Sequence, residues 1–143
     1  MNIYFSCSIT GGRTEETVYQ TLVQEMLALG HEVPTAHLSS SDVEQVEGTA
    51  QPAEIFARDM KWLENCDLVV AEVTSPSHGV GYEIAIALTL GKPVLCCYQK
   101  GRKVSMILTG NSSPLLSFCA YETVEQAAAG VRAFLSGLAA KNR

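Results

Sequence analysis

Short apolar runs alternate along this chain with segments of helical periodicity, and this alternation restricts the possible folds more than any other feature. Asn2–Cys7 alternates apolar and polar side chains, as a strand does. Thr14–Leu29 then places an apolar residue at every third or fourth position, and Gly30 supplies a helix stop. Leu68–Val73 is a valine-rich run typical of a buried central strand. The pattern predicts strands and helices in alternation.

The remaining segments continue this pattern. We expect strands at His31–Thr35, Val94–Tyr98 and Ser117–Tyr121, and helices over Pro52–Asn65, Gly81–Leu90 and Thr123–Ala139. Leu38–Gln51 is rich in serine and glutamate, so we expect a polar loop of a length that often serves function. Strands that alternate with helices form a mostly parallel sheet through right-handed crossovers. The sequence therefore predicts an α/β fold, a single domain over residues 1–143 whose five-stranded sheet carries helices on both faces, Rossmann-like or flavodoxin-like.

Composition narrows the class of protein. The chain has 143 residues, of which 47% are hydrophobic and 17% charged, which is typical of a globular domain. Its net charge of −5, without any basic run, argues against a nucleic acid polymer as partner. The apolar stretches are far shorter than the ~20 residues that span a bilayer, and no signal peptide is visible at the start of the sequence. We therefore expect a cytoplasmic protein that binds no membrane.

Neither the cysteines nor the histidines indicate a metal site. The five cysteines are odd in number and form no CxxC pattern, so we read them as reduced core residues of a cytosolic protein. The three histidines lack the spacing of zinc ligands. We expect no metal and no organic cofactor.

The turn after the first expected strand, Ser8–Arg13, is the first candidate for a binding site. Gly11 and Gly12 let a ligand approach the backbone closely, and Arg13 adds a positive charge near the start of a helix. The turn is therefore a candidate phosphate cradle, although it matches neither GxGxxG nor a Walker loop. The alternative is an ordinary tight turn in which Ser8 caps the helix.

Two carboxylates are the second candidate feature. Glu83 falls near the start of a helix, on the side that turns toward the sheet, where a carboxylate is costly unless it is used or paired. Asp59 lies in the apolar stripe of Pro52–Asn65, where burial would raise its pKa and keep a proton available to a general acid. The alternatives are a surface glutamate favoured by the helix dipole and an aspartate that caps a loop.

A carboxylate pair beside a phosphate cradle suggests cleavage at an anomeric carbon. One carboxylate would act as nucleophile and the other as acid, as in retaining glycosidases. Tyr4 lies on the first expected strand near the cradle, where its hydroxyl could orient the nucleophile. The alternative for Tyr4 is an ordinary strand aromatic.

Three segments of the sequence resemble a known family. They are Tyr4–Arg13 (YFSCSITGGR), Asp59–Leu63 (DMKWL) and Ala71–Glu83, which ends in GVGYE. These segments resemble the 2′-deoxynucleoside 5′-phosphate N-hydrolases, which belong to the nucleoside 2-deoxyribosyltransferase superfamily. The resemblance runs from the first strand to about Tyr121.

The resemblance implies a role for each matching residue. Glu83 would be the nucleophile that attacks C1′ of the deoxyribose, Asp59 would assist departure of the base, and Tyr4 would orient Glu83. Ser105 would reach the phosphate across a homodimer interface, so that the two subunits share each site. The substrate-binding positions would be Cys7, Ser8, Ile9, Thr10, Gly11, Gly12, Arg13, Tyr19, His37, Ser77, Gly79, Ser105 and Met106, with Tyr19 and His37 at the nucleobase end.

Two serines bear on the substrate. The transferases of the superfamily place Asp and Asn where this chain has Ser77 and Ser105, and an Asp would repel a phosphate. The serines therefore favour a nucleoside monophosphate, whereas Thr10 stands where better-known members have Arg. The sequence predicts a hydrolase of 2′-deoxynucleoside 5′-monophosphates. The alternatives are a nucleoside 2-deoxyribosyltransferase, an N-glycosidase of ribonucleotides such as CMP, and a catalytically silent nucleotide-binding module.

Overall fold

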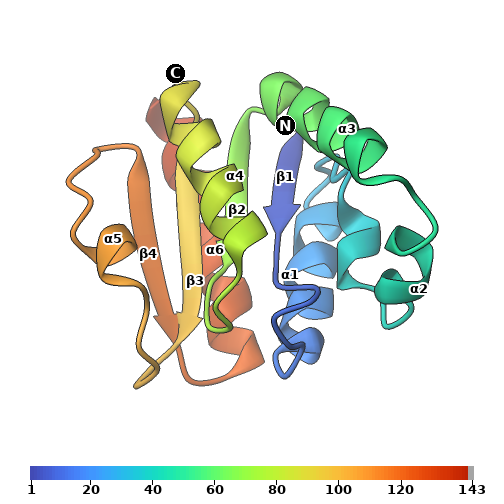
Figure 1. The fold of residues 1–143 in the computed structure, drawn as a ribbon. Helices are drawn as coiled ribbons and strands as arrows, with labels where there is room; N and C mark the ends of the chain where they lie inside the picture. Colours follow the sequence, from blue (N-terminus) through green and yellow to red (C-terminus); the bar gives the residue numbers. More distant parts are fainter. Residues whose placement is uncertain (142–143) are drawn as a thin grey trace.

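Four parallel strands form the central sheet, in the order β1-β2-β3-β4 (Figure 1). The computed structural model describes residues 1–141, so the last two residues of the predicted 1–143 domain lie outside the described residues. The strands are β1 (Ile3–Ser6), β2 (Leu68–Glu72), β3 (Val94–Gln99) and β4 (Leu116–Tyr121). The expected parallel α/β architecture is confirmed, but the sheet has four strands and not five.

The fifth expected strand, His31–Thr35, is reduced to a single bridge between Asn2 and Glu32. Pro34 has no N–H to continue a ladder. The next possible pairing partner on β1, the Phe5 N–H, instead donates to the Thr35 hydroxyl at 2.8 Å. The segment therefore lies along the edge of β1 without becoming a strand.

Helices cover both faces of the sheet (Figure 1). One face packs against α1 (Glu16–Ala28) and α6 (Val124–Lys141), which also contact each other. The opposite face packs against α3 (Pro52–Asn65) and α4 (His78–Thr89). The prediction of helices on both faces is confirmed.

The two core layers follow from the period of two along β1. All four residues of β1 are fully buried, and Ile3 and Phe5 belong to the layer beneath α1 and α6. Tyr4 belongs to the other layer, with Ile84 of α4. Ser6 lies two residues after Tyr4 and so points to the same face of the sheet. The hydroxyls of Tyr4 and Ser6 therefore both face α4.

Helix boundaries depend on capping and on local packing. Pro52–Asn65 is helical as predicted, with proline in its first turn and a capping box between Gln51 and Glu54. The helix expected from Gly81 begins earlier, at His78, because the Ser77 hydroxyl caps the Val80 N–H at 3.4 Å.

The expected loop Leu38–Gln51 is partly helical. It contains the end of η1 (Ala36–Ser39) and the whole of α2 (Val43–Glu47). The buried Val43 side chain anchors α2 in the core. A further short helix that the periodicity did not predict is α5 (Met106–Thr109). Within residues 1–141, no helix combines the length and the apolar character needed to cross a bilayer.

Candidate active site

A cavity of about 700 Å³ opens where the β1–α1 turn meets α2, α3 and α4. Its walls mix aliphatic and aromatic side chains with four carboxylates. The lining residues are Cys7, Ile9, Thr10 and Leu38, then Glu44, Glu47, Gly48, Pro52, Ile55, Phe56, Asp59 and Met60, and Ser77, Gly79, Val80, Tyr82 and Glu83. Both predicted catalytic carboxylates therefore face one cavity.

Glu83 is held by two hydroxyl groups from β1. The Tyr4 hydroxyl donates to Oε1 at 2.9 Å, and the Ser6 hydroxyl donates to Oε2. The pKa of Glu83 is raised to about 7, mainly by burial and also by the charge of Asp59, while the two hydroxyl donors partly offset this because they stabilise the ionised form. Glu83 is thus a paired, oriented carboxylate rather than a surface residue favoured by the helix dipole.

The sequence did not predict Ser6 as a site residue. A strand with period two places residues i and i+2 on one face, so the alternation that set Tyr4 toward α4 also sets Ser6 there. That alternation is the signal that could have identified Ser6.

Asp59 is the second carboxylate, and its side chain is mostly buried. Burial raises its pKa, as predicted, while the neighbouring Arg58 guanidinium lowers it. Arg58 Nε donates to Asp59 Oδ1 at 2.9 Å. The side chain is therefore paired with a cation on its own helix and faces the cavity.

The glycine turn needs both of its glycines. Gly12 has a φ of 109°, which L-residues rarely adopt. A Cβ on Gly11 would lie 2.4 Å from the Pro76 carbonyl oxygen, so glycine lets the turn pack directly against the segment before Ser77. Ser8 does not cap α1, whose N-cap is Glu15. Instead, the Ser8 hydroxyl is buried and, among residues 1–141, has no hydrogen-bond partner.

Arg13 braces this turn. Its guanidinium donates to the carbonyl oxygens of Ser8 at 3.1 Å, Leu38 at 2.9 Å and Ser40 at 3.1 Å. A fourth donor, Nε, pairs with the Glu16 carboxylate at 3.1 Å. The guanidinium is thus occupied by the protein itself, and Arg13 stands outside the set of residues that line the cavity. The structure does not place its charge in the predicted phosphate cradle.

The two residues expected at the nucleobase end also lie outside the cavity lining. Tyr19 is fully buried in α1, with its ring 6.2 Å from that of Phe5 and beneath Arg13. His37 lies behind the cavity wall, where its Nε2 is 2.7 Å from Glu47 Oε1. Glu47 does line the cavity, so the contact between His37 and the cavity runs through the Glu47 carboxylate.

A second cavity, of about 620 Å³, adjoins the first at Ser77 and Val80. It is lined by Ser105 and Met106, together with Lys103 and Ile107. Within one chain the structure therefore brings Ser77 and Gly79 to the carboxylates, but it leaves Ser105 and Met106 in the neighbouring cavity.

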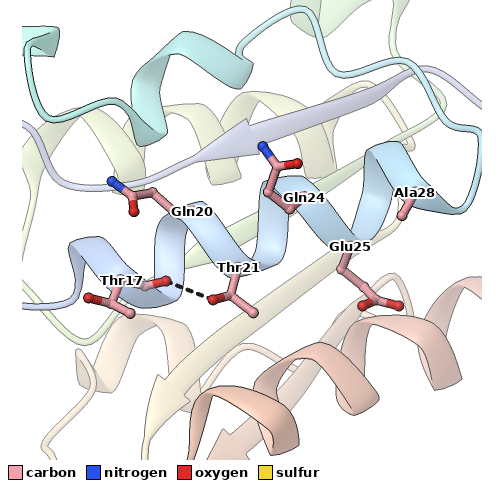
Figure 2. Close-up of a pocket in the computed structure, with 6 residues that line it drawn as sticks. All are labelled: Thr17, Gln20, Thr21, Gln24, Glu25 and Ala28. Atoms are coloured by element: carbon pink, nitrogen blue, oxygen red, sulfur yellow. Dashed lines mark hydrogen bonds between the residues drawn. The ribbon is translucent and has the colours of Figure 1, made fainter.

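A third hollow runs along the outer side of α1 (Figure 2). The residues that line it are Thr17, Gln20, Thr21, Gln24, Glu25 and Ala28. The only charged side chain of this set, Glu25, pairs with Arg132 of α6 at 2.7 Å. The hollow thus offers no pair of carboxylates for chemistry. Across residues 1–141, no group of three or more His, Cys, Asp or Glu side chains is arranged to hold a metal ion.

Comparison with known proteins gives a consistent set of relatives. A family model described as nucleoside 2-deoxyribosyltransferase matches residues 3–131. The 5-hydroxymethyl-dUMP N-hydrolase of Rattus norvegicus is 40% identical over 113 residues, covering 76% of this chain and 69% of the relative. The protein of the same name from Danio rerio is 39% identical over 129 residues, covering 87% of this chain and 90% of the relative.

A solved structure agrees at the level of the fold. The CMP N-glycosidase of Clostridium botulinum superposes with a TM-score of 0.69 at 16% sequence identity, covering 92% of this chain and 99% of that one.

Proposed function

This chain belongs to the nucleoside 2-deoxyribosyltransferase family, and we propose that it hydrolyses the N-glycosidic bond of 2′-deoxynucleoside 5′-monophosphates. The products are a free nucleobase and 2-deoxyribose 5-phosphate. One observation carries the proposal: Glu83, gripped by Tyr4 and Ser6, faces the same cavity as the buried Asp59. The relatives support it, because 5-hydroxymethyl-dUMP is itself a 2′-deoxynucleoside 5′-monophosphate.

In the proposed reaction, ionised Glu83 attacks C1′ and a Glu83–C1′ ester bond forms as the bond to the base breaks. The base leaves with the electron pair of that bond, and Asp59 supplies it with a proton. Water then attacks C1′, Asp59 accepts the proton of that water, and Glu83 is released as a carboxylate. Tyr4 and Ser6 keep the attacking oxygen aimed and stabilise its charge. The chemistry needs neither a metal nor an organic cofactor.

We place the 5′-phosphate at the start of α4. Ser77 and Gly79 line the cavity there, and the free N–H groups of a helix N-terminus favour an anion. Thr10 faces them from the glycine turn, with Cys7 and Ile9 beside it. The neutral hydroxyls of Ser77 and Thr10 can donate hydrogen bonds to a phosphate without charge repulsion. Arg13 supports this end indirectly, through the loop that it braces.

We further propose a homodimer in which Ser105 and Met106 complete the partner's phosphate end. Met106 and Ile107 are 86% and 84% exposed, and they lie beside the cavity that adjoins Ser77. Exposed apolar side chains next to a site are typical of an interface. A second copy that covers them would bring Ser105 toward the partner's phosphate.

We also propose that residues 1–143 form one catalytic domain and that the protein is cytoplasmic. All five cysteines are free thiols, and four of them are buried, which suits a reducing compartment. The net charge of −5 suits a small nucleotide better than a nucleic acid polymer.

The test is base release from dGMP, dAMP, dCMP and dTMP, followed by chromatography, with Glu83→Gln as the matched inactive variant. We expect release from at least one nucleotide and a loss of about a thousandfold or more in Glu83→Gln. Release from none of them, or full activity in Glu83→Gln, would refute the proposal.

Three further arms of the experiment separate the alternatives. A second free base in the mixture would give an exchanged product if the chain were a transferase. Faster cleavage of CMP than of dCMP would indicate a ribonucleotide glycosidase. Binding in a calorimeter without any product would indicate a silent nucleotide-binding module.

A further inference from the structure

One guanidinium group lies between two carboxylates at the wall of the cavity. Arg58 donates from Nη1 and Nη2 to the two oxygens of Glu47, each at 3.0 Å, in a bidentate pair. The same guanidinium donates from Nε to Asp59 Oδ1 at 2.9 Å. Asp59 and Glu47 line the cavity, whereas Arg58 stands behind them. Arg58 is therefore placed to act on a bound substrate through these carboxylates.

A second layer holds this arrangement in place. His37, from η1, is 2.7 Å from Glu47 Oε1, and because a carboxylate only accepts, the Nε2 atom carries the proton. The ring of Trp62 lies 4.7 Å from the Arg58 guanidinium carbon and 5.9 Å from the His37 ring. Side-chain contacts thus join η1 and α2 to Asp59 on α3.

We propose that Arg58 is a positioning residue that aims the Asp59 carboxyl group at the departing base. In this proposal Glu47, which binds the same guanidinium, weakens the interaction between Arg58 and Asp59. This inference rests on the proposed function, in which Asp59 gives a proton to the departing base. It gives α2 and η1 a part in the chemistry, although the sequence suggested only a polar loop there.

The two partners of Asp59 act in opposite directions on its proton. Arg58 lowers the pKa of Asp59, and the negative charge of Glu47 raises it. The other groups that face Asp59 are His37 of η1, which lowers its pKa, and Glu83 of α4 and Tyr4 of β1, on whose pKa values the charge of Asp59 acts in turn. Opposed shifts show that both partners act on the Asp59 proton, and turnover then tests whether Arg58 also aims the carboxyl group.

The first test measures the Asp59 proton directly. Carbon-13 labelling of the aspartate carboxyl groups allows an NMR titration, with Asp59→Asn assigning the signal. We expect Arg58→Gln to raise the pKa of Asp59 by about one unit and Glu47→Gln to lower it. Lys61→Gln and Glu64→Gln are the controls. Both side chains are exposed on α3, and the substitutions remove one positive and one negative charge, as Arg58→Gln and Glu47→Gln do. Shifts of the same sign, or none, in folded variants would overturn the inference.

The second test uses turnover. The limb of the pH profile that disappears in Asp59→Asn should move upward in Arg58→Gln and downward in Glu47→Gln. Misdirection of Asp59 should lower kcat about tenfold to a hundredfold in Arg58→Gln with a smaller change in KM. Arg58→Lys keeps the charge but not the two-pronged geometry, so it should retain the wild-type limb and recover only part of kcat. Unchanged kcat in Arg58→Gln would overturn the inference.

The two tests fail separately from the proposed function. If the wild-type protein releases no base, the proposed function is refuted, and the NMR titration still decides whether Arg58 and Glu47 act on Asp59 in opposite directions. If the wild type is active and the titration shows no opposed shifts, only the role of Arg58 and Glu47 is refuted.

Discussion

The hydrogen bond from Tyr4 to Glu83 leads to a quantitative prediction for Tyr4→Phe. The substitution removes one hydroxyl and leaves the ring, so the packing of β1 against α4 is kept. It also removes the 2.9 Å hydrogen bond to Glu83 Oε1, which stabilises the ionised carboxylate. Without that donor the pKa of Glu83 must rise, because its protonated form has lost less than its charged form.

The size of the effect follows from the pKa of about 7. A hydrogen bond to a charged group contributes about 1.5–3 kcal/mol, and one pKa unit corresponds to about 1.4 kcal/mol. Tyr4→Phe should therefore move the pKa of Glu83 to roughly 8–9. The ionised fraction at pH 7 then falls from about half to between about a tenth and a hundredth, which lowers kcat/KM about 5-fold to 50-fold.

The assay is base release as a function of pH, read as kcat/KM. The limb that rises with pH should move to higher pH in Tyr4→Phe, and the loss of kcat/KM relative to the wild type at the same pH should shrink above about pH 9. Ser6→Ala should shift the same limb in the same direction. Tyr98→Phe on β3 is the control, because Tyr98 packs against Phe118. A limb that stays in place, or an equal loss of activity at every pH, would refute the reasoning.

Three further predictions concern stability, assembly and the glycine turn. Burial raises the pKa of Glu72 from 4.5 to about 7, so its ionisation opposes folding: the free energy of unfolding should fall as pH rises from 4.5 through 7, and Glu72→Gln should remove roughly 3 kcal/mol of that fall. Urea denaturation at pH 5 and pH 8 measures this, and an unchanged pH dependence in the variant would contradict it. Joint replacement of Met106 and Ile107 by Asp should turn a dimer into a monomer in sedimentation and reduce base release; a wild-type monomer, or a variant dimer, would contradict the proposed interface. Gly11→Ala should lower stability by about 1–3 kcal/mol and raise KM, because its Cβ would meet the Pro76 carbonyl oxygen, whereas Gly137→Ala on α6 meets nothing within 4 Å and should do neither. Thermal unfolding and KM measurements compare the two alanine variants, and equal behaviour would refute the packing argument.

Local signals predicted most of the fold. The valine-rich run at Leu68–Glu72 and the proline at the start of α3 act within a few residues, so their consequences are visible in the sequence. The fifth strand was wrong because Pro34 has no N–H to continue a ladder and the Thr35 hydroxyl, not a backbone carbonyl, accepts from the Phe5 N–H. The hydroxyl contact depends on where β1 lies beside the segment, which the local sequence does not reveal.

The site likewise combines features that the local sequence predicts with features that depend on distant residues. That Glu83 and Asp59 face one cavity could be anticipated, because a carboxylate on an apolar helix face is conspicuous wherever the helix packs. The contacts of Arg13 could not be predicted, because the sequence does not reveal that three carbonyl groups, two of them more than 20 positions away, accept from its guanidinium. Arg58 and Glu47 were missed for a related reason, since their pairing requires α2, which the sequence suggested only as a loop.

The ring of Trp62, between Arg58 and His37, has a consequence for experiments on this protein. It is the only tryptophan in the chain, so all indole fluorescence comes from the wall that carries Asp59. Indole emission responds to neighbouring charges and to protonation of a contacting imidazole. A nucleotide that shifts Asp59 or Glu47 on binding should therefore change the emission of the unlabelled protein, and stopped-flow mixing can time that change against base release.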